Sequence, residues 1–132
     1  MTVAIIGTAV LAALVFVLGF NVSRMRGVTA KAGGQQLPTD PSDPLFKAIR
    51  AHGNAAEYVP TLIVLFLLVG SRSPAVVATV LIAGATGCRL LHAYAMLSAP
   101  SLATRSKPRE LGAIGTYVFG LALAVTAAVS LL

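Results

Sequence analysis

The stretch that decides the fold is residues 43–60, DPLFKAIRAHGNAAEYVP, which opens an apolar segment long enough to cross a membrane. Arg50, Asn54 and Glu57 follow the spacing i, i+4, i+7, so on a helix they fall within about 60° of one another. A cation, an amide and a carboxylate on one side of a membrane helix are costly unless they face a partner or a water-filled cavity. The stretch therefore predicts a binding site inside a helical bundle.

The composition is that of an integral membrane protein. Of the 132 residues, 57% are hydrophobic and only 11% are charged, and the mean hydropathy is +0.87. So few charges cannot cover the surface of a soluble domain. The net charge of +6 resides in short segments between apolar runs and forms no basic face, which argues against a nucleic-acid partner.

Apolar segments of membrane-spanning length predict an all-α fold, an integral membrane four-helix bundle in a single domain. We expect helices at about residues 3–24, 44–69, 74–97 and 108–132, the first extending up to one turn further. No cation precedes the first segment, so it is interpreted as a retained helix and not as a cleaved signal peptide. Asp43 followed by Pro44 is a typical helix start, and Pro60 predicts a bend within the second helix.

The cations of the chain predict its orientation in the membrane. Those of the first and third loops and the start of the fourth helix are Arg24, Arg26, Lys31, Arg105, Lys107 and Arg109, whereas the second loop has only Arg72. Positive loops stay in the cytoplasm, so both termini are expected outside. The polar residues of the second helix, Arg89 and His92 of the third, and Arg109 then share the cytoplasmic end. The Ala-rich composition suggests a bacterial inner membrane.

Clustered arginines with a single carboxylate predict a site for an anionic, zwitterionic ligand. Arginine holds carboxylates through paired hydrogen bonds, and Glu57 can take an ammonium group. An arginine beside a thiol stabilises the thiolate, which is the reactive nucleophile. His52 and His92 lie apart from the single cysteine and from further carboxylates, so a metal site is not expected.

The second-helix stretch closely resembles the signature of the MAPEG family, the membrane-associated proteins of eicosanoid and glutathione metabolism. That signature is arginine, three residues, asparagine, two residues, glutamate, often an aromatic residue, and then proline; residues 50–60, RAHGNAAEYVP, match it. The resemblance extends over the whole chain. It includes a basic pair after the first helix, Arg-x-x-His in the third, and an arginine that opens the fourth.

The resemblance implies a homotrimer of four-helix subunits, with glutathione bound between adjacent subunits near the cytoplasmic face. The positions that resemble glutathione-binding residues of the family are Arg24, Arg50, Asn54, Glu57, Tyr58, Arg89 and His92. Arg109 resembles the fourth-helix arginine that stabilises the glutathione thiolate. Arg105 is the alternative for that role, because the loop length leaves the register open.

The third helix departs from the family pattern at one position. Animal synthases of the family often have a tyrosine seven residues after the arginine, where this chain has Met96. Tyr94 lies about 140° from Arg89 on an ideal helix, so it is a poor substitute. The departure argues against a specific eicosanoid synthase and is compatible with a generic glutathione transferase or peroxidase.

Three functions are open on the sequence alone. The first is an enzyme that joins glutathione, as co-substrate and without a metal, to lipid-soluble electrophiles dissolved among the membrane lipids. The second is a non-catalytic protein of the same fold that binds lipid or glutathione. The third is a small multidrug transporter, but such exporters usually depend on a glutamate in the first helix, and residues 3–24 contain none.

Overall fold

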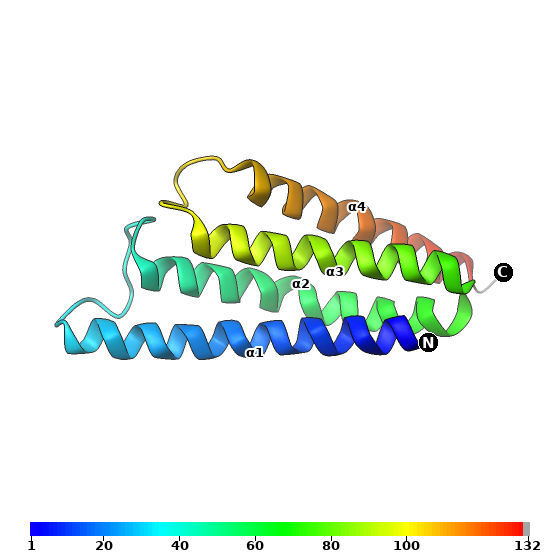
Figure 1. Ribbon diagram of the computed structural model, residues 1–132, viewed down its shortest axis with the longest axis horizontal. Coiled ribbons are helices and arrows are strands. Elements are labelled where there is room, and N and C mark those ends of the chain that lie inside the picture. The colour runs from blue at the N-terminus through cyan, green and yellow to red at the C-terminus, as the bar shows by residue number, and fades with distance from the viewer. Residues whose placement is uncertain (131–132) are drawn as a thin grey trace.

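The computed structural model describes residues 1–130, and within them it contains four α-helices and no strand (Figure 1). The helices are α1 (Thr2–Lys31), α2 (Pro44–Arg72), α3 (Ala75–Ser98) and α4 (Lys107–Val129). Each is long and apolar enough to cross a bilayer. The predicted all-α class is confirmed. The predicted end of the fourth helix, residues 131 and 132, lies outside the described residues.

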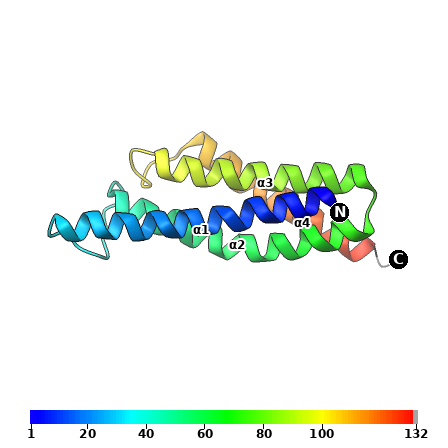
Figure 2. The same ribbon diagram turned by 60° about the horizontal axis from the view of Figure 1, so that its bottom comes forward.

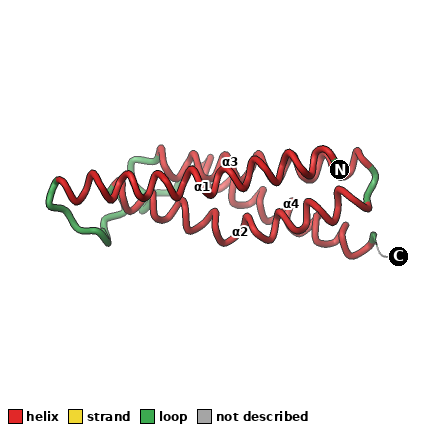
Figure 3. The backbone as a smooth tube through the Cα atoms, turned by 90° about the horizontal axis from the view of Figure 1, so that it is seen from below, coloured by secondary structure: helices red, strands yellow, loops and turns green. Residues whose placement is uncertain are grey.

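The four helices run alternately in opposite directions and form an elongated bundle (Figures 1 and 2). The start of α1 and the end of α4 lie beside the α2–α3 turn, while the other two connections lie together at the opposite end of the bundle. Irregular backbone is confined to these ends, as Figure 3 shows. α2 and α3 lie between α1 and α4, which lie on opposite sides of the bundle and do not contact each other.

α2 begins where the sequence predicts it. One carboxylate oxygen of Asp43 accepts hydrogen bonds from the backbone N–H groups of Leu45 at 2.7 Å and Phe46 at 3.2 Å. Pro44 is the first helical residue, where its missing N–H costs nothing. The helix then continues through Pro60 to Arg72.

α1 is longer than the sequence predicts, because it ends at Lys31 and not within a turn of Arg24. Hydropathy marks where a membrane span ends, whereas a helix can continue into water. Arginine, lysine and alanine are good helix formers, and no proline interrupts residues 24–31. The chain turns only at Gly33, whose φ of +69° favours glycine. The end of α1 therefore projects beyond the rest of the bundle (Figure 1).

The interior of the bundle is packed with small and aliphatic side chains, and large apolar side chains also cover its outside. Phe16 and Phe20 on α1 are 78% and 72% exposed, and Leu121 on α4 is 70% exposed. Such a surface would be unfavourable in water and is expected where lipid covers the protein. The distribution fits an integral membrane bundle.

α3 and α4 approach each other closely at Gly112. A Cβ atom at this position would lie 2.7 Å from the backbone nitrogen of His92, which is too close for any side chain. Small residues permit such contacts between membrane helices, where dispersion forces and hydrogen bonds drive packing. This contact fixes the start of α4, and with it Arg109, against the loop end of α3.

Candidate functional site

The polar residues of α2 do not all point into the four-helix bundle, although their spacing predicts a site inside it. Arg50 and Glu57 are exposed, and Asn54 is half-buried. Ala51 and Ala55 are 1% and 0% exposed and form the buried face of α2. Arg50 precedes Ala51 by one residue, a rotation of about 100°, and Glu57 follows Ala55 by two, a rotation of about 200°, so both positions are turned away from this buried face. Arg50 and Glu57 therefore lie on the outside of a single chain.

Arg89 is a buried cation in α3. Arg89 is 1% exposed, and its Nη2 donates a hydrogen bond to Oδ1 of Asn54 at 2.5 Å. Its guanidinium carbon lies 5.1 Å from the centre of the Tyr58 ring. Within residues 1–130 no carboxylate forms an ion pair with Arg89, and its Nε has no hydrogen-bond partner. An amide and an aromatic face therefore stabilise this charge.

Two tyrosines from different helices meet next to Arg89. The hydroxyls of Tyr58 and Tyr117 are hydrogen-bonded to each other at 3.3 Å, and the ring centres are 5.8 Å apart. Among the three tyrosines that the sequence offers as phenols for the site, Tyr58, Tyr94 and Tyr117, only Tyr58 is in the predicted glutathione-binding set. A signal was present in the sequence, because Tyr117 follows Arg109 by the same eight positions that separate Tyr58 from Arg50.

A pocket of about 350 Å³ lies at the end of the bundle that carries the α1–α2 and α3–α4 loops. Its lining residues are Pro41, Phe46, Arg50, His92, Met96, Leu102, Ala103 and Arg109. The structure thus brings together Arg50 of α2, His92 of α3 and Arg109 of α4. Met96 contributes an apolar wall.

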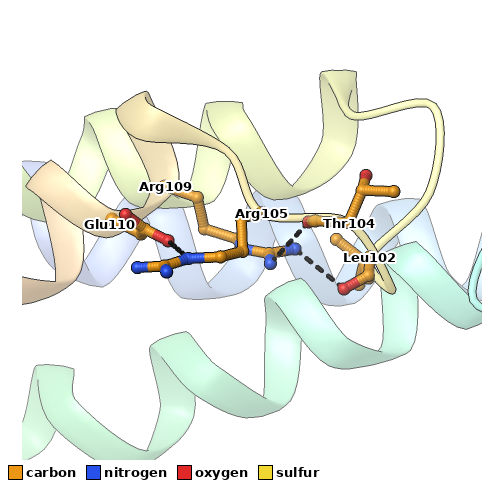
Figure 4. Close-up of polar contacts among 5 residues, drawn as sticks. All are labelled: Leu102, Thr104, Arg105, Arg109 and Glu110. Carbon is orange, nitrogen blue, oxygen red and sulfur yellow. Dashed lines mark hydrogen bonds and ion pairs between the residues drawn. The ribbon is translucent and has the colours of Figure 1, made fainter.

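Arg109 reaches back toward the α3–α4 loop (Figure 4). Its Nη1 donates to the carbonyl oxygen of Leu102 at 3.1 Å, and its Nη2 donates to that of Thr104 at 2.9 Å. A guanidinium has five N–H donors, so three are left for a ligand. The backbone contacts hold the side chain at the wall of the pocket.

Arg105 has a different environment. Its side chain is 89% exposed, and its Nε donates to a carboxylate oxygen of Glu110 at 2.6 Å (Figure 4). This hydrogen bond raises the pKa of Arg105 above its ordinary value. Arg105 does not line the pocket, so its geometry suits a loop-stabilising contact better than a ligand contact.

His92 connects α3 to α4. Its Nδ1 lies 2.8 Å from the carbonyl oxygen of Arg109, and the residue is 7% exposed. A carbonyl oxygen can only accept, so Nδ1 carries the proton that forms this bond. In the neutral ring, Nε2 is then a hydrogen-bond acceptor. His92 therefore positions the first turn of α4 and also contributes to the pocket wall.

Other predicted residues lie away from this pocket. Arg24 lies at a separate pocket of about 300 Å³, where Lys47 also contributes a cation, and it donates to Oδ1 of Asn21 at 3.0 Å. Glu57 lines neither pocket and forms no ion pair within residues 1–130. Tyr94 is 69% exposed and does not take the place of a tyrosine at position 96. A single chain therefore assembles only part of the predicted site.

Comparison with known proteins identifies the family. The model of the MAPEG family matches residues 4–129, which include all the polar residues described above. A search of curated protein sequences returns no match to this chain. Since the family match covers nearly the whole sequence and the four helices are of membrane-spanning length, this integral membrane protein belongs to the MAPEG family.

Proposed function

We propose that this protein is a membrane glutathione transferase that joins the glutathione thiolate to hydrophobic electrophiles, with a peroxidase reaction open to the same thiolate. The observation that carries the proposal is the succession of a cationic pocket and an apolar groove along the α2–α4 side of the bundle. Arg50 precedes Tyr58 by eight residues, and Arg109 precedes Tyr117 by eight, a rise of about 12 Å on each helix. Membership of the MAPEG family supports the same reaction class.

The apolar groove has a volume of about 400 Å³ and lies between α2 and α4. Its lining residues are Tyr58, Thr61, Leu62, Leu65, Thr116, Tyr117, Gly120, Leu121 and Ala124. An apolar compound dissolved in the bilayer can enter it sideways, while a water-soluble thiol enters the cationic pocket from the loop end. Binding of the two compounds at adjacent sites would hold them close together, which is the basis of catalysis by proximity.

A homotrimer would complete the site. Arg50 and Glu57 are exposed on a membrane helix, where charge is costly without a partner. A second subunit placed against this face can contribute its own Arg24, with glutathione between the two subunits. We propose both termini outside and the site at the cytoplasmic face, because the basic loops lie at the pocket end. A bacterial inner membrane is the proposed location.

The proposed roles follow from the charges. Arg50 and the partner subunit's Arg24 bind the carboxylates of glutathione, and Glu57 binds its ammonium group. Arg109 donates its free N–H groups to the thiolate and so favours the ionised form. Asn54, Tyr58, Arg89 and His92 complete the glutathione-binding set, with Arg89 acting through its bond to Asn54.

A second candidate function is non-catalytic binding of lipid or glutathione on the same fold. It is favoured by the two backbone carbonyls that already engage Arg109, and by Met96 in place of a phenol. Such a protein would bind ligand in the groove and show no turnover with any electrophile.

The experiment compares Arg109→Ala with Arg105→Ala in detergent-purified protein, using glutathione and a generic aryl halide. If Arg109 holds the thiolate, its loss lowers kcat more than it weakens glutathione binding, because the interaction is strongest with the developing nucleophile. Arg105→Ala, which removes a cation of the same loop region, should retain most activity. Equal loss of turnover and binding in Arg109→Ala would contradict the assigned role.

A further inference from the structure

We infer that the hydroxyl of Tyr117 donates a hydrogen bond to the carbonyl oxygen of the electrophile, which makes apolar α,β-unsaturated carbonyl compounds a substrate class of this protein. The inference rests on the proposed thiol transfer and adds to it a catalytic residue and a preference among electrophiles. It is based on the hydrogen bond between the two tyrosines, which uses only one of their two O–H protons, and on the apolar walls around them.

The Tyr58–Tyr117 hydrogen bond leaves one hydroxyl proton without a partner. The two oxygens lie 3.3 Å apart, and a single hydrogen bond between them uses only one of their two O–H protons. Tyr58 is half-buried, whereas Tyr117 is 50% exposed and lines the groove. When Tyr58 donates to Tyr117, the O–H of Tyr117 is free to donate to a ligand in the groove.

Arg89 makes the pair a stronger donor. Its guanidinium carbon lies 5.1 Å from the centre of the Tyr58 ring, where a cation draws electron density from the aromatic system. Hydrogen bonds in series polarise one another, so a more polar O–H in Tyr58 strengthens donation by Tyr117. The side chain of Arg89 is fixed in turn by Asn54. Arg89 and Tyr58 are therefore positioning residues, and Tyr117 is the group that meets the substrate.

The rest of the groove selects an apolar body with a single polar atom. Its walls are almost wholly apolar, and the hydroxyl of Thr116 donates to the carbonyl oxygen of Gly112 at 2.7 Å. Thr61 is the other hydroxyl of the wall and lies on α2. A ligand that buries an oxygen here needs a donor, because an unpaired buried acceptor is costly. Tyr117 meets that need at the end of the groove nearest the cationic pocket.

The chemistry that this geometry supports is conjugate addition. The thiolate sulfur attacks the β-carbon of the unsaturated carbonyl compound and forms a C–S bond. The electron pair of the C=C bond moves toward oxygen and gives an enolate, whose charge the Tyr117 hydroxyl stabilises. The α-carbon then takes up one proton from water, which replaces the proton that the thiol released to water when it ionised. The thiol and the unsaturated compound supply every atom of the product.

The test compares two electrophiles with one variant. Tyr117→Phe should lower kcat/KM for trans-2-nonenal about 10- to 100-fold, since removing a donor to a developing oxyanion has effects of this order. For benzyl chloride, whose substitution forms no oxyanion, kcat/KM should change less than about twofold. Tyr94→Phe is the matched control, because Tyr94 is exposed on α3 outside the groove. Equal losses for both substrates, or no loss for either, would overturn the inference.

Two further variants separate the residues of the wall. Tyr58→Phe removes the hydroxyl that is hydrogen-bonded to Tyr117 and should give a smaller loss with the same preference for trans-2-nonenal. Thr61→Val should leave the ratio of the two substrates unchanged. If Thr61→Val produces the selective loss and Tyr117→Phe does not, the donor has been assigned to the wrong residue.

Binding without a thiol separates this inference from the proposed function. Displacement of a fluorescent apolar probe measures the affinity for 2-nonanone and for nonane, which cannot undergo conjugate addition. Tyr117→Phe should weaken binding of the ketone at least fivefold more than binding of the alkane. If no electrophile is turned over but this difference holds, the transferase proposal fails and the donor role of Tyr117 survives. If the ketone and the alkane bind the variant with unchanged relative affinity, the donor role of Tyr117 is wrong.

Discussion

Replacement of Asn54 by leucine should destabilise the protein through Arg89. The Asn54 side chain is the hydrogen-bond acceptor that the structure gives to this buried guanidinium, whose Nε already lacks a partner within residues 1–130. A hydrogen bond to a charged group contributes about 1.5–3 kcal/mol. Leucine has a volume similar to that of asparagine but lacks the acceptor, whereas the cation–π contact between Arg89 and Tyr58 is kept. We therefore expect Asn54→Leu to lower the free energy of unfolding by about 2–3 kcal/mol.

Replacing the cation should cost less than removing its partner. Methionine fills much of the volume of arginine without a charge, and apolar substitution of buried ionic groups is often nearly neutral, so we expect Arg89→Met to change the free energy of unfolding by less than about 1 kcal/mol. In the double variant Asn54→Leu/Arg89→Met, the apolar side chains face each other. The double variant should therefore be more stable than Asn54→Leu alone.

The assay is reversible unfolding of the purified protein by titration of a denaturing detergent into mixed micelles. The four proteins form a double-mutant cycle, from which the Asn54–Arg89 interaction is obtained directly. The reasoning is refuted if Asn54→Leu is as stable as the parent protein. It is also refuted if Arg89→Met is less stable than Asn54→Leu, since Arg89 would then be paired with an anion outside the single chain.

Three other predictions concern the helices and the first loop. Gly112→Val should lower the free energy of unfolding by about 1–3 kcal/mol through overpacking of α3 against α4, whereas Gly27→Ala, whose added Cβ meets nothing within 4 Å, should be neutral or stabilising in the same assay. Asp43→Ala should cost about 1 kcal/mol in that assay by removing the cap of α2, and Asp43→Ser should restore most of it. Hydrogen bonds from Ser42 hold the pKa of Asp40 below its ordinary value of 3.8. The stabilisation by Asp40 is therefore complete above that value and is lost as pH falls through the lowered pKa, so unfolding of Asp40→Asn should depend less on acidic pH.

The sequence predicts the helices well because hydropathy and helix starts are local signals. Asp43 and Pro44 determine the start of α2 through their own backbone and side-chain chemistry. The end of α1 is missed because the limit of a membrane span and the limit of a helix are different properties. The direction of Arg50 is missed for another reason. In a membrane bundle the outside is as apolar as the inside, so periodicity does not show which face of α2 meets its neighbours.

The candidate site is predictable only where one chain is sufficient to form it. Arg50, His92 and Arg109 meet at one pocket because alternating helix directions bring these ends together. Arg24 and Glu57 stay apart in the single chain, and sequence spacing carries no information about a neighbouring subunit. The pairing of Tyr117 with Tyr58 is not predicted, because the two residues lie on different helices.

The most direct measurement is ultraviolet absorbance of the glutathione thiolate on binding to the purified protein. We expect millimolar glutathione to bind and to give a thiolate signal near neutral pH. This signal should be lost in Arg109→Ala and retained in Arg105→Ala. Binding without a thiolate signal, or an equal signal from Arg109→Ala, would contradict the proposal that this arginine prepares glutathione for transfer. Absence of binding would favour a non-catalytic role and direct attention to the groove between α2 and α4.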